Sequence, residues 1–203
     1  MGSISPESRV RGRPRVRRAG GFLPGVAEAE GVMVGDGERR GSKGGSDCPA
    51  GPEVAVRSAG RADLLDVLRI ERESFTEPWP YAAFESLLDA PGFLVAVGGD
   101  ERGEQSVLGY VVGDVTPNHG RDIGHIKDLA VRPDARGGGI GRRLLREALM
   151  ELSLAGAVVA KLEVREGNDA ARSLYREEGF EPTRRVPRYY GDGEDALLLV
   201  TEL

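Results

Sequence analysis

The chain has 203 residues, enough for one domain of ordinary size and an extension, and 39% hydrophobic and 30% charged residues are typical of a globular protein. Cys48 is the only cysteine and there are two histidines, which excludes an internal disulfide and a metal centre built on cysteine pairs or a histidine cluster. No stretch reaches the roughly 20 apolar residues that a membrane span needs. We therefore expect a soluble protein of the reducing cytoplasm, without a membrane partner and without a metal.

Charge and composition divide the chain at about residue 52. Residues 1–52 carry a net charge of +3, are rich in Gly, Pro, Ser and Arg, and show no helical or strand periodicity. Such a segment buries too little apolar surface to offset its ordering entropy, so we expect a disordered extension rather than an arginine-rich nucleic-acid or targeting arm. Met33 offers an alternative translation start. Residues 53–203 carry a net charge of −8, which argues against nucleic acid as a partner and suits a cationic acceptor.

Hydrophobic periodicity predicts a mixed α/β domain in residues 53–203. The order of elements is β-α-α-β-β-β-α-β-α-β-β, with a parallel crossover at its centre. Residues 98–101 form a turn between two strands. The predicted strands are 54–57, 93–97, 107–115, 124–131, 158–164, 180–185 and 196–201. A first helix is predicted to begin near Leu64, and three further helices are predicted at 81–88, 140–154 and 169–178.

A glycine-rich turn at residues 137–141 links the predicted strand 124–131 to the amphipathic helix 140–154. Glycines expose backbone N–H groups beside a helix N-terminus, where the positive end of the helix dipole favours a diphosphate. An ordinary structural turn is the alternative. A dinucleotide-binding motif fits poorly, because a long segment and not a leading strand precedes this one.

Arg136, Gly139 and Gly141 match the pattern Arg/Gln-x-x-Gly-x-Gly, and the segment resembles the acetyl-CoA signature of the GNAT superfamily of N-acetyltransferases. The preceding Leu-Ala-Val-x-Pro at residues 129–133 is also similar to that family. The resemblance implies the GNAT fold, a central mixed sheet with helices on both faces, and acetyl-CoA as cosubstrate. It implies cofactor contacts from backbone groups of the strand end and from the turn. Together with Asn168 below, the expected cofactor-binding residues are Leu129, Ala130, Val131, Arg136, Gly137, Gly138, Gly139, Ile140, Gly141 and Arg142.

Glu163 interrupts an otherwise apolar strand, where an unpaired carboxylate is costly. A salt bridge to Lys161, Arg165 or another base is one explanation; a catalytic role is the other. Asn168 stands where a helix cap belongs, and Tyr175 lies seven residues later on about the same helical face. A tyrosine that only packs in the core is the alternative for Tyr175.

Residues 162–168, Leu-Glu-Val-Arg-Glu-Gly-Asn, and Leu174-Tyr175 with Gly179-Phe180 resemble the RimI-type protein N-terminal alanine acetyltransferases. By that resemblance Glu163 is the general base, acting through water, and Tyr175 is the general acid that protonates the departing CoA thiolate. Asn168 contacts the pantetheine arm. The chemistry agrees, because an ammonium must lose a proton before it attacks a thioester and a carboxylate with a raised pKa can take it.

The segment at residues 74–81, Ser-Phe-Thr-Glu-Pro-Trp-Pro-Tyr, is more similar to the acceptor-side loop of archaeal N-terminal acetyltransferases than to that of bacterial RimI. The resemblance implies a role for Glu77 in substrate handling or catalysis; a loop whose Trp79 and Tyr81 only cover the core is the alternative. Tyr189 and Tyr190 are expected to form the opposite wall of a peptide groove.

Three functions fit these patterns to different degrees. The first is acetylation of the N-terminal α-amino group of a protein or peptide, such as a ribosomal protein. The second is acetylation of a small-molecule amine or of a protein lysine. The third is a non-catalytic acetyl-CoA binder, which the presence of both Glu163 and Tyr175 argues against. The oligomeric state and the first residue of the acceptor do not follow from the sequence.

Overall fold

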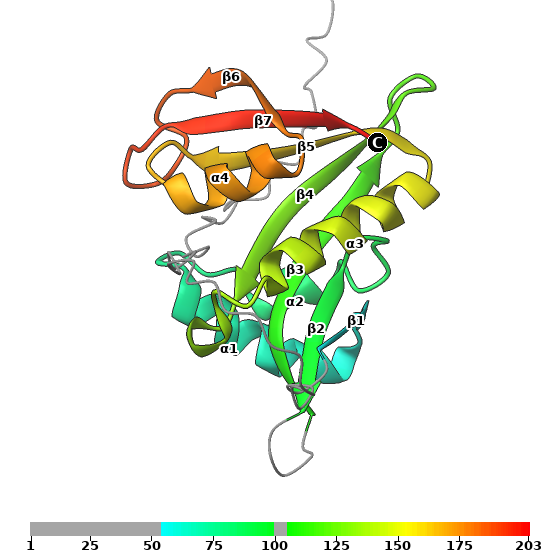
Figure 1. The fold of residues 1–203 in the computed structure, drawn as a ribbon, viewed down its shortest axis with the longest axis vertical. Helices are drawn as coiled ribbons and strands as arrows, with labels where there is room; N and C mark the ends of the chain where they lie inside the picture. The colour runs from blue at the N-terminus through cyan, green and yellow to red at the C-terminus, as the bar shows by residue number, and fades with distance from the viewer. Residues whose placement is uncertain (1–53, 100–104) are drawn as a thin grey trace, which may run out of the picture.

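The computed structural model describes residues 54–99 and 105–203, so the expected disorder of residues 1–52 lies outside the described residues, as do residues 100 and 101 of the expected turn. Gly98 and Gly99, also expected in that turn, instead end a strand. A seven-stranded sheet in the order β1-β2-β3-β4-β5-β7-β6 forms the centre of the molecule (Figure 1). The strands are β1 Ala55–Ser58, β2 Leu94–Gly99, β3 Gln105–Thr116, β4 Asp122–Val131, β5 Ala157–Arg165, β6 Glu181–Val186 and β7 Ala196–Glu202. The helices are α1 Leu64–Ser74, α2 Tyr81–Glu85, α3 Ile140–Leu154 and α4 Asp169–Glu177, with single 3-10 turns at Arg61–Asp63 and Pro133–Ala135.

The predicted order of elements and the mixed α/β class are confirmed, including the parallel crossover, which is α3 between β4 and β5. All other strand pairs are antiparallel. The predicted helix over 81–88 is shorter than expected, since α2 ends at Glu85 and the following residues form turns. Among the described residues, no helix combines the length and hydrophobicity that crossing a bilayer requires.

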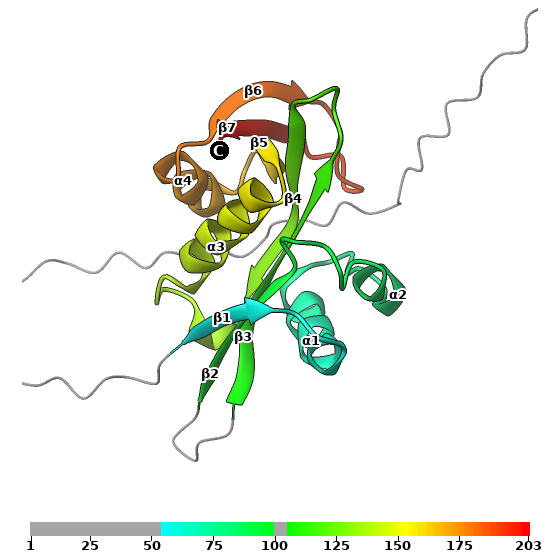
Figure 2. The same cartoon turned by 90° about the vertical axis from the view of Figure 1, so that its right-hand side faces the viewer.

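Helices cover both faces of the sheet, α3 and α4 on one and α1 and α2 on the other (Figure 2). Each face has its own buried apolar cluster. Leu144, Leu145 and Leu152 of α3 pack on the first face, and Val67 of α1 and Phe84 of α2 pack on the second. Because each fully buried apolar side chain stabilises the fold by about 1.5–3 kcal/mol, these clusters fix both helix pairs against the sheet.

The sheet splits between β4 and β5. Their parallel pairing runs only from Asp122 to His125 on β4 and from Ala157 to Lys161 on β5. Beyond this point β4 pairs with β3 and β5 with β7, and the two strands run apart toward their carboxyl ends (Figure 1). A bulge at Lys127 lies where the strands part, and bulges increase local twist. The ends of β4 and β5 therefore leave backbone groups without a strand partner between them.

Candidate functional site

The glycine-rich turn has the backbone that its sequence predicts. Gly137 and Gly139 have φ of +82° and +79°, in the left-handed region that disfavours side chains. A Cβ at either position would meet no atom of residues 54–99 or 105–203 within 4 Å, so these residues leave the space beside the turn open. Gly139 is the N-cap of α3, and the first amides of any helix lack an intrahelical acceptor. The turn and the start of α3 therefore offer N–H donors to an anion.

Backbone groups of β4 face the split. The N–H of Arg132 donates to the carbonyl of Leu108 on the β3 side, at 2.8 Å. Hydrogen-bonded and non-hydrogen-bonded pairs alternate along an antiparallel ladder, so the backbone groups of Val131 and Leu129 point away from β3. They point toward β5, which has already diverged. Of these groups, the Val131 carbonyl accepts a bond from Arg136 and the Leu129 N–H bonds the carboxyl of Asp128. An extended amide-bearing chain such as pantetheine fits the groups that remain.

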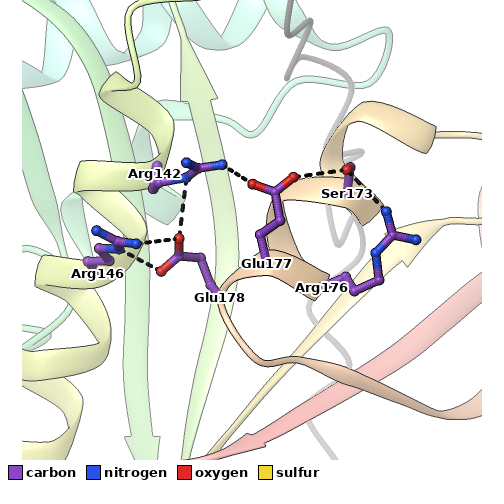
Figure 3. Close-up of polar contacts among 6 residues, drawn as sticks. All are labelled: Arg142, Arg146, Ser173, Arg176, Glu177 and Glu178. Carbon is purple, nitrogen blue, oxygen red and sulfur yellow. Dashed lines mark hydrogen bonds and ion pairs between the residues drawn. The ribbon is translucent and has the colours of Figure 1, made fainter.

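The arginines of the turn have protein partners. Arg136 donates from Nε to the carbonyl of Val131 at 2.9 Å and from Nη2 to Ser74 Oγ at 3.3 Å. Arg142 pairs with Glu177, the last residue of α4, and with Glu178, its C-cap. Glu178 also accepts two bonds from Arg146, at 2.6 and 2.9 Å (Figure 3). Arg136 thus closes the turn onto the end of β4, while Arg142 joins α3 to α4. For both residues, a contact with the cofactor stays a prediction.

Glu163 lies on β5 beside His125 of β4. Glu163 Oε2 is 2.6 Å from His125 Nε2, and Oε1 is 3.7 Å from Lys161 Nζ. The two side chains of the closer pair are 11% and 18% exposed. The salt bridge to Lys161 considered from the sequence is therefore present, whereas Arg165 instead bonds Asp192 and Glu194, at 2.8 and 2.6 Å.

The expectation of a raised pKa at Glu163 is wrong. Burial does raise the pKa of this carboxyl, but the hydrogen bond and charge of His125, followed by Lys161, outweigh burial and hold the pKa below its ordinary value. Glu163 is therefore ionised at neutral pH. As a carboxylate it can accept a proton from a cationic amine, directly or through water.

His125 is the site residue that the sequence analysis missed. His125 lies on the strand whose end is predicted to bind the cofactor, and it belongs to none of the motifs found in the sequence. The pairing of His125 with Lys161 in the parallel ladder brings it next to Glu163, two residues further along β5. Only the register between β4 and β5 reveals this neighbour.

Tyr175 is buried on α4, and its ring packs edge-on against Phe180 with centroids 5.8 Å apart. Burial, followed by the charge of Asp128 on β4, raises the pKa of the phenol, so Tyr175 keeps its proton at neutral pH. Asn168 caps α4 as predicted, since its side chain accepts a bond from the Ala171 N–H at 3.0 Å. The cap fixes the start of the helix that carries Tyr175.

Two loops meet at the side of the site opposite the turn. The carboxylate of Glu77 lies so close to Gly191 that a Cβ there would be 2.6 Å from Oε1. Tyr189 is half-buried, and burial, followed by the charge of Glu163, raises its pKa to about 12. The structure thus places Tyr189 within electrostatic range of Glu163 and places Glu77 against the loop that carries Tyr189.

The other three predicted wall residues differ in exposure. Trp79 is buried and packs against Phe84 with centroids 5.4 Å apart, as the core-covering alternative expected. Tyr190 is buried under the guanidinium of Arg165, 4.0 Å from its ring centroid, whereas Tyr81 is 37% exposed. Within the described part of the chain, Trp79 Nε1 and the Tyr190 hydroxyl are buried without a hydrogen-bond partner. Both are donors, which a peptide carbonyl could satisfy.

This arrangement is that of an N-acetyltransferase. The family model described as the Acetyltransferase (GNAT) family matches residues 64–180, and the chain belongs to this family. N-alpha-acetyltransferase of Sulfolobus acidocaldarius is 35% identical over 159 residues, which cover 73% of this chain and 92% of that protein. N-alpha-acetyltransferase RimI of Mycobacterium tuberculosis is 37% identical over 159 residues, covering 72% and 90%. The solved structure of Ard1 from Thermoplasma volcanium superposes with a TM-score of 0.65 at 28% identity, covering 74% of this chain and 97% of that one. The resemblance to RimI-type and archaeal enzymes is thereby confirmed.

Proposed function

We propose that the protein transfers an acetyl group from acetyl-CoA to the N-terminal α-amino group of a protein, and that residues 53–203 form the catalytic domain. The observation that carries the proposal is that an ionised Glu163 on β5 lies beside the split, across from the end of β4, where backbone groups have no strand partner. Relatives named N-alpha-acetyltransferase, and one named putative ribosomal protein bS18-alanine N-acetyltransferase, support an N-terminal acceptor.

Acetyl-CoA fits the site by the chemistry of the groups present. The amides of residues 137–142 would bind the diphosphate, and the backbone of Leu129 and Val131 would bind the pantetheine arm and the acetyl oxygen. Asn168 lies at the start of α4, on the opposite arm. When bound, acetyl-CoA supplies an activated acetyl thioester.

The side chains then provide a base and an acid. Glu163 accepts a proton from the acceptor ammonium, which frees the nitrogen lone pair to attack the acetyl carbon. The N–C bond forms and the C–S bond breaks. Tyr175 donates its proton to the departing sulfur and regains one as the new amide nitrogen loses its surplus proton. The walls formed by Glu77, Trp79, Tyr81, Tyr189 and Tyr190 would bind the first residues of the acceptor.

Mass spectrometry of acetylated peptides tests the proposal. Peptides with a free N-terminus and an internal lysine are incubated with acetyl-CoA and the protein, together with matched peptides whose N-terminus is blocked. We expect acetylation of the α-amino group and none of the blocked peptides. Acetylation confined to lysine side chains, or to small amines added in place of peptides, would contradict the proposal.

A further inference from the structure

A chain of buried polar groups crosses the apolar cluster between the sheet and helices α1 and α2. Glu71 of α1, Tyr110 of β3 and Asp128 of β4 are all buried. Glu71 Oε1 accepts a hydrogen bond from the backbone N–H of Trp79 at 2.7 Å. The Tyr110 hydroxyl contacts Glu71 Oε2 and lies 2.8 Å from Asp128 Oδ2. No step of the mechanism above is assigned to these three groups, although the charge of Asp128 is one cause of the raised pKa of Tyr175.

The two contacts of the Tyr110 hydroxyl require one proton in addition to the hydrogen of the phenol itself. A phenol has a single hydrogen and can donate to only one of the two carboxyl groups that it contacts. The other contact needs a carboxyl O–H that donates to the phenol oxygen. Burial raises the pKa of Asp128 well above its ordinary value and also raises that of Glu71, in keeping with one proton held by the pair.

The two ends of this chain lie at the two binding surfaces of the site. Trp79 belongs to the loop that carries Glu77, on the acceptor side. Asp128 directly follows the bulge at Lys127 and lies immediately before Leu129, whose backbone faces the split. Each link between these ends is a hydrogen bond between buried groups, so the loop and the strand hold a fixed relative position.

We propose that Glu71 is a positioning residue that sets the distance between the acceptor-side loop and the β4 bulge, and through it the approach of the acceptor nitrogen to the thioester. The inference rests on the proposed function. Reacting atoms must be held about 3–3.5 Å apart, and a shift of about 1 Å can cost roughly 10²-fold in rate. Apolar residues of similar volume often stabilise a core as much as buried ionisable groups do, so stability alone does not explain the presence of Glu71 and Asp128.

Two alanine variants separate positioning from stability. Glu71→Ala removes the link, and Asp63→Ala removes another buried carboxyl just before α1 that bonds Arg57 and Gly60 instead. We expect Glu71→Ala to lower kcat for a peptide acceptor about 10- to 100-fold while the KM for acetyl-CoA stays within about threefold. Asp63→Ala should lower Tm but leave kcat within about threefold. Equal losses of kcat in the two variants would overturn the inference, as would an unchanged kcat in Glu71→Ala.

Trp79, the only tryptophan in the chain, reports the position of the loop independently of catalysis. Its fluorescence emission should move to longer wavelength in Glu71→Ala and stay unchanged in Asp63→Ala. An emission maximum in Glu71→Ala that equals the wild-type value would contradict the inference, whether or not the wild-type protein is active. A wild-type protein that acetylates no α-amino group would contradict the proposed function, and the fluorescence result would still test the inference.

Two conservative variants complete the test. In Glu71→Gln the amide oxygen can accept from Trp79 and the amide N–H₂ can donate to Tyr110, whose hydroxyl then donates to an ionised Asp128. We expect this variant to recover kcat to within about fivefold of wild type.

Should Glu71→Ala not fold, Tyr110→Phe keeps the bond between Glu71 and Trp79 but removes the link to Asp128. This variant should lower kcat about 10-fold while the KM for acetyl-CoA stays unchanged. An unchanged kcat in Tyr110→Phe would overturn the inference.

Discussion

Glu163 shows how neighbours decide the protonation state of one side chain. Glu163→Gln keeps the shape of the side chain but removes its ability to accept a proton, so kcat should fall by about 10²-fold or more. The measurement is the steady-state rate with a peptide acceptor at saturating acetyl-CoA. Glu166→Gln is the matched control, because Glu166 pairs with Arg185 at the surface; comparable losses in both variants would exclude Glu163 as the base.

His125 controls the pKa of Glu163, and its removal has a predictable sign. In His125→Ala the partner that lowers the pKa is lost while much of the burial that raises it remains, so the pKa of Glu163 rises. The carboxylate form that accepts the proton then disappears at a higher pH. We predict that the acid limb of the profile of kcat/KM against pH moves to higher pH than in wild type. A limb that stays in place or moves to lower pH would contradict this account.

The lowered pKa of Glu163 also makes the stability of the fold depend on pH. A glutamate whose pKa is lowered by folding contributes stability above its unfolded pKa, and that contribution is lost as pH falls through the folded pKa. The unfolded pKa is near the ordinary value of 4.5, so Glu163 contributes fully at neutral pH. The difference in Tm between wild type and Glu163→Gln should therefore be larger at neutral pH than at about pH 4.

At the scale of elements, two comparable glycines at the ends of α3 test the role of the turn before that helix. Gly139 lies at the start of α3 and Gly156 lies after its end. Both have left-handed backbone, with φ of +79° and +97°, and open space around the missing Cβ. Alanine at either position should cost about 1–2 kcal/mol of stability through backbone strain.

Only Gly139→Ala should also weaken acetyl-CoA binding, since only this turn is proposed to bind the diphosphate. Calorimetric titration of both variants checks the prediction. Equal affinities in the two variants would show that the turn before α3 does not contribute to the site.

The sequence predicted the individual helices and strands far better than it predicted how they lie against one another. Apolar spacing in residues 140–154 and the glycines before them predicted α3 and its first turn, because both signals are local. The split between β4 and β5, the bulge at Lys127 and the contact between His125 and Glu163 depend on strand register, which no local pattern encodes. For the same reason the link from Glu71 through Tyr110 to Asp128 could not be predicted.

At the scale of the whole molecule, both apolar clusters and all the proposed site residues lie within residues 54–203. We therefore predict that a chain of residues 53–203 folds and keeps kcat and the KM for acetyl-CoA within about threefold of the full chain. Steady-state kinetics of the two chains, with circular dichroism to verify folding, is the measurement. A large loss of activity in a folded shorter chain would assign residues 1–52 a part in the reaction.

The central claim is that the split between β4 and β5, with the turn before α3, binds acetyl-CoA and presents its thioester to Glu163. Isothermal titration calorimetry of the folded protein with acetyl-CoA tests this claim most directly. We predict saturable binding of one acetyl-CoA per chain, with much weaker binding of acetyl-pantetheine, which lacks the diphosphate. Absence of binding by acetyl-CoA, or equal binding of the two compounds, would contradict the account.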